Sequence, residues 1–258
     1  MNYAYPIMTR RGLCNLLFTW ASAESYCHKT GATMIEPNWT SGMRLGPWIR
    51  GERYKRYYGG LFDSEGHVAG IRKYAILLFC KKMVLRFCGM EGFFDPFIDD
   101  QPHIKSALWR MTRRNIVLGV EKCLTEPFVA IHIRRGDFRQ AGHVVEDRWF
   151  VDATREALRM MGSQSDNILV RVFTDGYPEE VLFLQRAFPS VKIVIQDKAS
   201  PMFDLLLMSK AKVLVGSAKS TFSMWPVFLG QMPSIWAKDG ADSLPRLYYG
   251  TEDKAVFI

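Results

Sequence analysis

The stretch FVAIHIRRGDFRQ (residues 128–140) begins as an apolar run and ends abruptly in charge. A run of six residues with a single polar member, His132, is typical of a strand that is covered on both faces. By itself the histidine fits a satisfied core residue, and an arginine pair such as Arg134 and Arg135 fits a solvated surface. The position of the two arginines directly after a buried strand favours a binding role for them instead. Asp137 follows in the same loop.

Similar apolar runs recur from residue 126 to the end of the chain. Short Val/Ile-rich runs alternate with helical patterns, which predicts a parallel sheet with helices on both faces. Strands are expected at residues 128–133, 168–174, 191–196, 213–216 and 233–236, and helices at residues 148–161, 178–188, 201–210 and 221–229. This half is predicted to be a doubly wound α/β domain.

Local signals refine three of these helices. Ser200 followed by Pro201 is an N-cap with proline at the first helical position. Gly230 is expected in the left-handed conformation that ends a helix. Pro226 lies inside TFSMWPVFLG, so the last helix is expected to start later than Thr221.

The first 125 residues are less regular. An apolar stripe from Leu13 to Cys27 predicts one helix, with Gly31 as its stop. Helical patterns return at residues 69–87 and 104–118, and residues 38–67 indicate long surface loops. The sequence therefore predicts two domains, residues 1–125 and residues 126–258.

Composition narrows the function. The 258 residues carry 34 Lys and Arg against 26 Asp and Glu, a net charge of +8, which favours an anionic partner. No segment reads as a signal peptide or a membrane span, so a soluble, cytoplasmic protein without an integral membrane segment is expected. Five cysteines without CxxC spacing argue against a disulfide framework and a zinc site.

Three loops could hold a phosphate. Arg134 stands at the carboxyl edge of its strand, where parallel sheets bind ligands. The loop GSAKST (residues 216–221) joins a strand to a helix, and its Ser220 and Thr221 could hold a phosphate at the helix N-terminus. Gly12, in RRGLCN (residues 10–15), stands before the first helix. Because no DxD triplet is present to chelate a metal, arginine would have to replace it.

Four segments together resemble a known family. HIRRGD resembles the HxRRGD signature of the GDP-fucose-dependent fucosyltransferase superfamily, and most closely that of glycosyltransferase family 11, the α-1,2-fucosyltransferases. DLLLMSKAKVLVGSAKSTFSMWPVFLG, RRGLCNLLFTWASAESYCHKTG and VFTDGYPEEV resemble other segments of that family, in the same order. Residues 38–120 are the least similar part.

The resemblance implies an α/β fold of the GT-B type, in which two Rossmann-like domains enclose a cleft. Residues 1–125 would form the acceptor-side domain and residues 126–258 the GDP-sugar-binding domain. The implied activity is inverting, metal-independent transfer of L-fucose from GDP-fucose to a glycan acceptor, without a cofactor. The resemblance implies that Arg134 binds the β-phosphate of GDP and that Arg135 assists. It also implies contacts of His132 and Asp204 with guanine and of Ser220 and Thr221 with the phosphates. The contacts that it implies for the first domain are those of Gly12, Cys14 and Asn15 with the pyrophosphate.

Some positions depart from the family pattern. Its N-terminal Gly-Asn-Gln reads Cys14-Asn15-Leu16 here, its Ser-Asp-Asp reads Thr174-Asp175-Gly176, and its Trp-Trp reads Met224-Trp225. Asp137, Glu146 and Asp147 all remain candidates for a general base.

Alternatives to fucosyl transfer stay open. They are a transferase that uses another GDP-sugar, and a GDP- or glycan-binding module without turnover. Nucleic-acid binding rests on the net charge and on the basic, aromatic loop from Arg50 to Tyr58, and we expect none.

Overall fold

The computed structural model describes residues 2–39, 58–64, 66–135, 145–162, 168–197, 200–217, 219–250 and 252–258. The chain divides into two compact units, Met1–Val117 and Leu118–Ile258. The division falls within helix α5 (Arg114–Cys123), eight residues before the expected boundary (125 minus 117). Each unit is described by itself.

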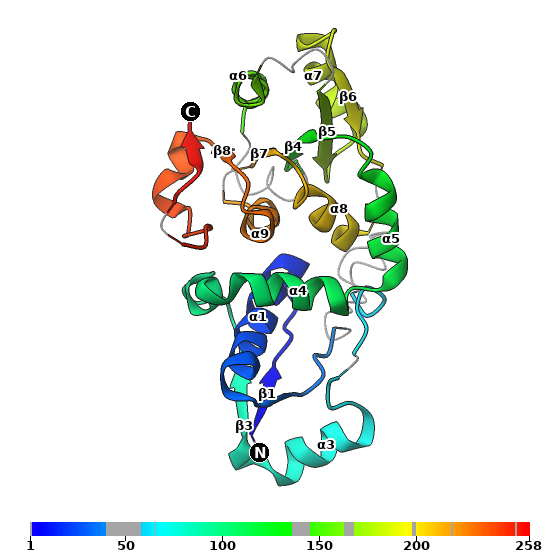
Figure 1. The fold of residues 1–258 in the computed structure, drawn as a ribbon, viewed down its shortest axis with the longest axis vertical. Helices are drawn as coiled ribbons and strands as arrows, with labels where there is room; N and C mark the ends of the chain where they lie inside the picture. Colours follow the sequence, from blue (N-terminus) through cyan, green and yellow to red (C-terminus); the bar gives the residue numbers. More distant parts are fainter. Residues whose placement is uncertain are drawn as a thin grey trace. The chain divides into compact units, whose positions relative to one another are not determined.

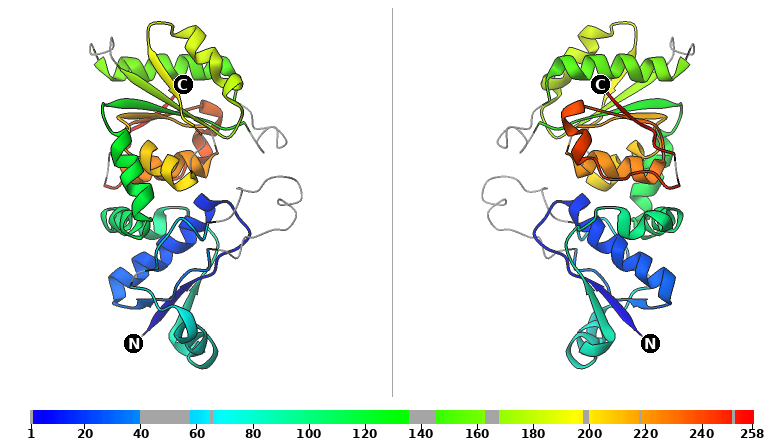
Figure 2. Two further views of the ribbon diagram at one scale, coloured as in Figure 1. Left: turned by 90° about the vertical axis from the view of Figure 1, so that its right-hand side faces the viewer. Right: turned by 90° about the vertical axis from the view of Figure 1, so that its left-hand side faces the viewer.

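The second unit is built on a six-stranded sheet in which every neighbouring pair is parallel (Figures 1 and 2). Its strands are β4 (Phe128–Ile133), β5 (Leu169–Thr174), β6 (Lys192–Ile195), β7 (Val213–Val215), β8 (Ser234–Trp236) and β9 (Ala255–Phe257). The order across the sheet is β6-β5-β4-β7-β8-β9. Counted from β4, this is 3-2-1-4-5-6, the doubly wound order in which the chain changes direction between β4 and β7.

Helices cover both faces of this sheet. Figure 2 shows α6 (Asp147–Met160) and α7 (Leu182–Ala187) on one side and α8 (Pro201–Met208) and α9 (Thr221–Gly230) on the other. All six residues of β4 are buried, as expected for a central strand between two layers. The predicted doubly wound architecture is confirmed, and its five expected strands are all present.

The ends of the helices test the local signals. The Ser200 hydroxyl accepts a hydrogen bond from the backbone N–H of Phe203 at 3.2 Å, so the predicted N-cap is confirmed. The helix expected at residues 178–188 instead begins as a 3₁₀ turn (Pro178–Val181) before α7. Strand β9 was not predicted from the sequence.

Two expectations for α9 are wrong. The helix starts at Thr221 and keeps Pro226 inside, where burial on all sides outweighs the hydrogen bond that proline cannot donate. The left-handed residue at its end is Gln231, with φ of 56°, and not Gly230. Gly230 is needed for space, because a Cβ there would clash with the backbone carbonyl oxygen of Ser209.

The first unit holds a smaller parallel sheet of order β2-β1-β3. Its strands are β1 (Tyr3–Pro6), β2 (Thr33–Met34) and β3 (Val84–Phe87), and its helices include α1 (Leu13–Thr30), α3 (Gly70–Phe79), α4 (Gln101–Met111) and the start of α5. The predicted first helix is confirmed. Gly31 ends it at φ of 72° and donates its N–H to the Cys27 carbonyl oxygen at 2.8 Å.

Two helices predicted in this unit are longer than the helices in the structure. The pattern at 69–87 ends as a helix at Phe79, and its last four residues form β3, which pairs with β1. The pattern at 104–118 breaks at Thr112, which is extended at ψ of 134°. Of the loops expected at 38–67, residues 40–57 and 65 lie outside the described residues. Within the part of the chain that the structure describes, no helix combines the length and the apolar character needed to cross a membrane.

Candidate functional site

Ser217 joins the ends of β4 and β7, where the strand order reverses. Its hydroxyl donates to the carbonyl oxygen of His132 at 2.8 Å and accepts from the backbone N–H of Arg134 at 3.0 Å. Ser217 is buried, so both hydrogen bonds are shielded from water. The chain direction at Arg134 is therefore fixed by the neighbouring strand.

Asp175 fixes the same turn from the other side. It follows β5, whose last residue Thr174 pairs with Ile133, the last residue of β4. One carboxylate oxygen accepts the backbone N–H of Arg135 at 2.7 Å, and the other lies 3.7 Å from Nε of Arg134. Gly176 allows this approach, because a Cβ there would lie 2.9 Å from Cβ of Arg135.

The two arginines have different surroundings. The Arg135 side chain is only 6% exposed, and its guanidinium donates to the Val145 carbonyl oxygen at 3.0 Å and to the carboxylate of Asp147. It also lies 5.8 Å from the centre of the Phe150 ring. The Arg134 side chain is 25% exposed. Arg134 is thus the cation that a ligand could reach at this edge, whereas Arg135 holds α6 against the end of β4.

His132 is buried inside β4. Its Nδ1 lies 2.7 Å from the Ser223 hydroxyl, and its ring centre lies 5.2 Å from that of Phe222. Burial, reinforced by the positive charge of Arg134, lowers the pKa of His132 to about 4. The imidazole is therefore neutral at neutral pH and presents one donor and one acceptor.

Asp204 is a largely buried acid in the first turn of α8. Its Oδ1 has no hydrogen-bond partner among the described residues. Burial raises the pKa of Asp204 to about 7. A buried carboxyl group without a partner is costly in a folded chain and is suited to accept hydrogen bonds from a ligand.

The loop 216–221 leads from β7 into α9, and all of it except residue 218 is described. Ser220 is the N-cap residue of α9, yet its buried hydroxyl makes no capping bond and has no hydrogen-bond partner among the described residues. Thr221 is the first helical residue and is partly buried. The N-terminus of α9 thus offers N–H groups and a spare hydroxyl beside the ends of β4 and β7.

The three predicted residues of the first unit lie at the start of α1. Gly12 is its N-cap residue, and its carbonyl oxygen accepts the N–H groups of Asn15 at 3.0 Å and Leu16 at 3.2 Å. Cys14 is buried and Asn15 is partly buried. A Cβ on Gly12 would meet no atom within 4 Å, so the fold of this unit does not require glycine there.

Of the three candidates for the general base, two lie within the described residues. Asp137 lies outside the described residues. Glu146 is the exposed N-cap residue of α6, and Asp147 accepts from Arg135. No group of three or more metal-ligating side chains occurs within the described ranges.

Sequence reasoning missed Ser217 and Asp175, the two side chains that hold the β4 turn. Ser217 belongs to the loop GSAKST, but a serine in such a loop does not show whether it meets a ligand or the neighbouring strand. Asp175 matches the family's Ser-Asp-Asp segment, whereas the residues on either side of it differ. Its hydrogen bond to the backbone N–H of Arg135 joins residues 40 positions apart in the sequence. A polar residue directly after each of two adjacent parallel strands is the signal that could have found the contact.

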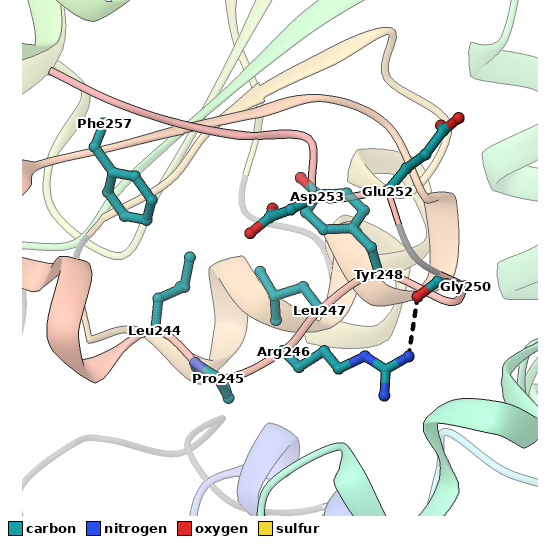
Figure 3. Close-up of a pocket in the computed structure, with 9 residues that line it drawn as sticks. All are labelled: Leu244, Pro245, Arg246, Leu247, Tyr248, Gly250, Glu252, Asp253 and Phe257. Carbon is teal, nitrogen blue, oxygen red and sulfur yellow. Dashed lines mark hydrogen bonds between the residues drawn. The ribbon is translucent and has the colours of Figure 1, made fainter.

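Cavities lie elsewhere in each unit. Figure 3 shows one of about 310 Å³ in the second unit, lined by residues from Leu244 to Phe257, where Arg246 donates to the Gly250 carbonyl oxygen at 2.9 Å. One of about 270 Å³ in the first unit is lined by Trp20, Glu24, His67 and Arg110, among others. Neither contains a predicted site residue, so the site rests on the β4 and β7 ends.

Comparison with protein-family models and with curated proteins found no match. Among solved structures, the chain is similar to NodZ α-1,6-fucosyltransferase co-crystallised with GDP, with a TM-score of 0.50 and 15% identity over 93% of this chain and 96% of that chain. It is also similar to POFUT1 in complex with GDP, with a TM-score of 0.52 and 15% identity over 91% of this chain and 98% of that chain. Both have the GT-B type of architecture, so the predicted α/β fold of this type is confirmed.

Proposed function

We propose that this protein is a fucosyltransferase that moves L-fucose from GDP-fucose to a hydroxyl group of a glycan. The observation that carries the proposal is the placement of Arg134. Its backbone is bonded to Ser217 and its side chain lies beside Asp175, at the point where the strand order reverses. Sheets of this type bind nucleotides at that point. Two of the solved structures that share the fold, NodZ α-1,6-fucosyltransferase and POFUT1, were determined with GDP.

The diphosphate would lie at the carboxyl edge of β4 and β7. Arg134 supplies a permanent cation with donors arranged to match phosphate oxygens. The N-terminus of α9 adds backbone N–H groups and the hydroxyls of Ser220 and Thr221. Together these groups would stabilise the negative charge that develops on GDP as it departs, so that no metal ion is needed.

The guanine base of GDP would be recognised by His132 and Asp204. Guanine presents N–H donors on one edge, and Asp204 offers a carboxyl oxygen that the described chain leaves unpaired. His132 offers a neutral imidazole that is held beside Ser223. Contacts of Gly12, Cys14 and Asn15 with the pyrophosphate remain predictions from the resemblance, as does the likeness to family 11 in particular.

The reaction would be a direct displacement. The acceptor oxygen forms a bond to C1 of fucose while the bond from C1 to the GDP oxygen breaks, and the configuration at C1 inverts. The acceptor proton passes to a carboxylate or to water. Asp147 already accepts from Arg135, which makes it the least suited of the three candidate acids. Asp137 and Glu146 remain.

Transfer assays separate this proposal from its alternatives. GDP-fucose and GDP-mannose are each incubated with the protein and a panel of glycan acceptors, with and without EDTA. We expect fucosyl transfer that EDTA leaves unchanged. Preference for GDP-mannose would indicate another GDP-sugar transferase, and GDP binding without turnover a binding module. Failure to bind GDP would overturn the assignment.

A further inference from the structure

Helix α3, labelled in Figure 1, turns large apolar side chains to solvent. Ile71 is 89% exposed, Tyr74 68%, Leu78 60% and Phe79 80%. Their spacing of i, i+3, i+7 and i+8 places all four on one face of the helix. Four such residues in one stripe exceed the scattered exposed apolar residues of an ordinary soluble surface.

The opposite face of α3 is anchored in the first unit. Ile76 is buried in a cluster with Tyr3, Ile35 and Val68. Lys73 is also buried, and its Nζ lies 3.8 Å from the carboxylate of Glu36 and 5.9 Å from the centre of the Tyr5 ring. A soluble helix usually buries its apolar residues and exposes its lysines, whereas α3 buries Lys73 and exposes four large apolar side chains. Packing within the first unit therefore does not explain the apolar stripe.

Basic residues accompany the stripe along the chain. Arg72 lies within α3, and Lys81, Lys82 and Arg86 follow it along the chain, all four exposed. The sequence contains no Asp or Glu from residue 66 to residue 90. The same segment exposes Met83 at 40% and Leu85 at 47%. We define residues 70–86 as the α3 face, an apolar stripe with an uncompensated basic border.

We propose that the α3 face binds the surface of an anionic membrane. An amphipathic helix with aromatic and aliphatic residues on one side and cations at its border lies in the plane of the interface. Ten residues of helix measure about 15 Å, which is half the thickness of the hydrocarbon core and too short to span it. Tyr74 suits the boundary between lipid tails and water, because its ring is apolar and its hydroxyl polar.

Charge argues for lipid over a second copy of this chain. A symmetric dimer through the α3 face would bring like basic borders together, and the face carries no acid to neutralise them. Anionic headgroups supply that neutralisation, about 1 kcal/mol for each Lys or Arg near the surface. The proposal is independent of fucosyl transfer.

Vesicle co-sedimentation of the full chain tests the proposal, with phosphatidylcholine vesicles compared with vesicles that also contain phosphatidylserine. We expect binding only with phosphatidylserine and weaker binding at higher salt. The double variant Lys81→Gln/Lys82→Gln should lower binding about 30-fold at low salt. The matched control Lys212→Gln/Lys238→Gln removes two exposed lysines of the second unit and should bind like the wild type.

A second pair of variants tests the apolar stripe. Ile71→Ser/Leu78→Ser should lower vesicle binding by at least about tenfold, because apolar burial supports interfacial binding. The control Tyr177→Ser/Tyr249→Ser changes two exposed aromatic residues of the second unit and should have little effect. Circular dichroism shows whether each variant is folded.

Three results would overturn the proposal. They are equal binding to both vesicle types, binding unaffected by the α3 face variants, and a dimer in solution that the stripe variant dissociates. The proposal would also be overturned if the wild-type protein bound RNA and not vesicles, and if the Lys81→Gln/Lys82→Gln variant lost that RNA binding.

Discussion

The Ser217 hydroxyl accepts the backbone N–H of Arg134 at 3.0 Å across the reversal of strand order. Because the same hydroxyl donates to His132, Ser217→Ala removes both bonds. We expect a loss of about 1 to 2 kcal/mol in the free energy of unfolding and about a tenfold weaker affinity for GDP. Urea unfolding and calorimetric titration measure the two effects.

Ser209→Ala is the control for Ser217→Ala. Ser209 is also buried, and its hydroxyl donates to the Leu206 carbonyl oxygen at 2.7 Å, at the C-terminal end of α8. It should lower stability without changing GDP affinity. Equal effects of both variants on GDP binding would show that Ser217 has no special place in the site.

Replacing Arg135 should affect stability more than replacing Arg134. The Arg135 guanidinium is buried against Phe150 and bonded to Val145 and Asp147, so Arg135→Ala should lower the free energy of unfolding by about 2 kcal/mol. Arg134→Ala should change it by less than about 0.5 kcal/mol, because its side chain is more exposed. Comparable losses in urea unfolding would contradict this division of roles.

Prediction from the sequence failed for the short strands β2 and β3 of the first unit. Each strand from β4 to β8 carries its own apolar run, so local pattern is enough to find it. β3 forms because Val84 and its neighbours pair with β1, about 80 residues earlier in the chain, and β2 is only two residues long. Such pairings depend on tertiary contacts that no local window contains.

The site was predictable to the same extent. The arginines, His132 and Ser220 were singled out because an unusual residue stood near a strand end or at a helix start, and their roles in a site stay predictions. The different surroundings of Arg134 and Arg135 were not, since they arise from α6, which places Asp147 and Phe150 against only one of them. Asp137 lies outside the described residues, and its role stays a prediction.

Asp204→Asn should stabilise the protein above neutral pH and weaken GDP binding. The folded-state pKa of Asp204 is raised to about 7 from an ordinary value of 3.8. The folded chain therefore binds more protons between these values, and the stability that the protonated group contributes is lost as pH rises toward 7. Relative to wild type, the variant should gain about 1 to 3 kcal/mol at pH 8 and little at pH 4.

The pKa of His132 is lowered to about 4 in the folded chain. Its contribution to the pH dependence of stability is present in both the wild type and Asp204→Asn, so it cancels when the two are compared. Asp239→Asn, at an exposed acid, is the control and should change neither stability nor GDP binding. If Asp204→Asn bound GDP as tightly as the wild type, the guanine contact would be wrong. Unfolding measured from pH 4 to pH 8 supplies the stability data.

Gly12→Ala separates the needs of the fold from those of a ligand. The glycine has φ of −64°, and no atom lies near an added Cβ, so the melting temperature should stay within about 2 °C. If the pyrophosphate approaches this backbone, GDP affinity should fall about tenfold or more, because an added methyl group blocks close approach. Unchanged affinity would remove Gly12 from the site.

The most direct test of the central claim is the rate of fucosyl transfer by Arg134→Ala, with Arg155→Ala, an exposed arginine of α6, as the control. If Arg134 stabilises the departing diphosphate, transfer from GDP-fucose should fall by at least about 100-fold, and GDP should bind more weakly. The control should keep wild-type activity. Near wild-type turnover by Arg134→Ala would contradict the account.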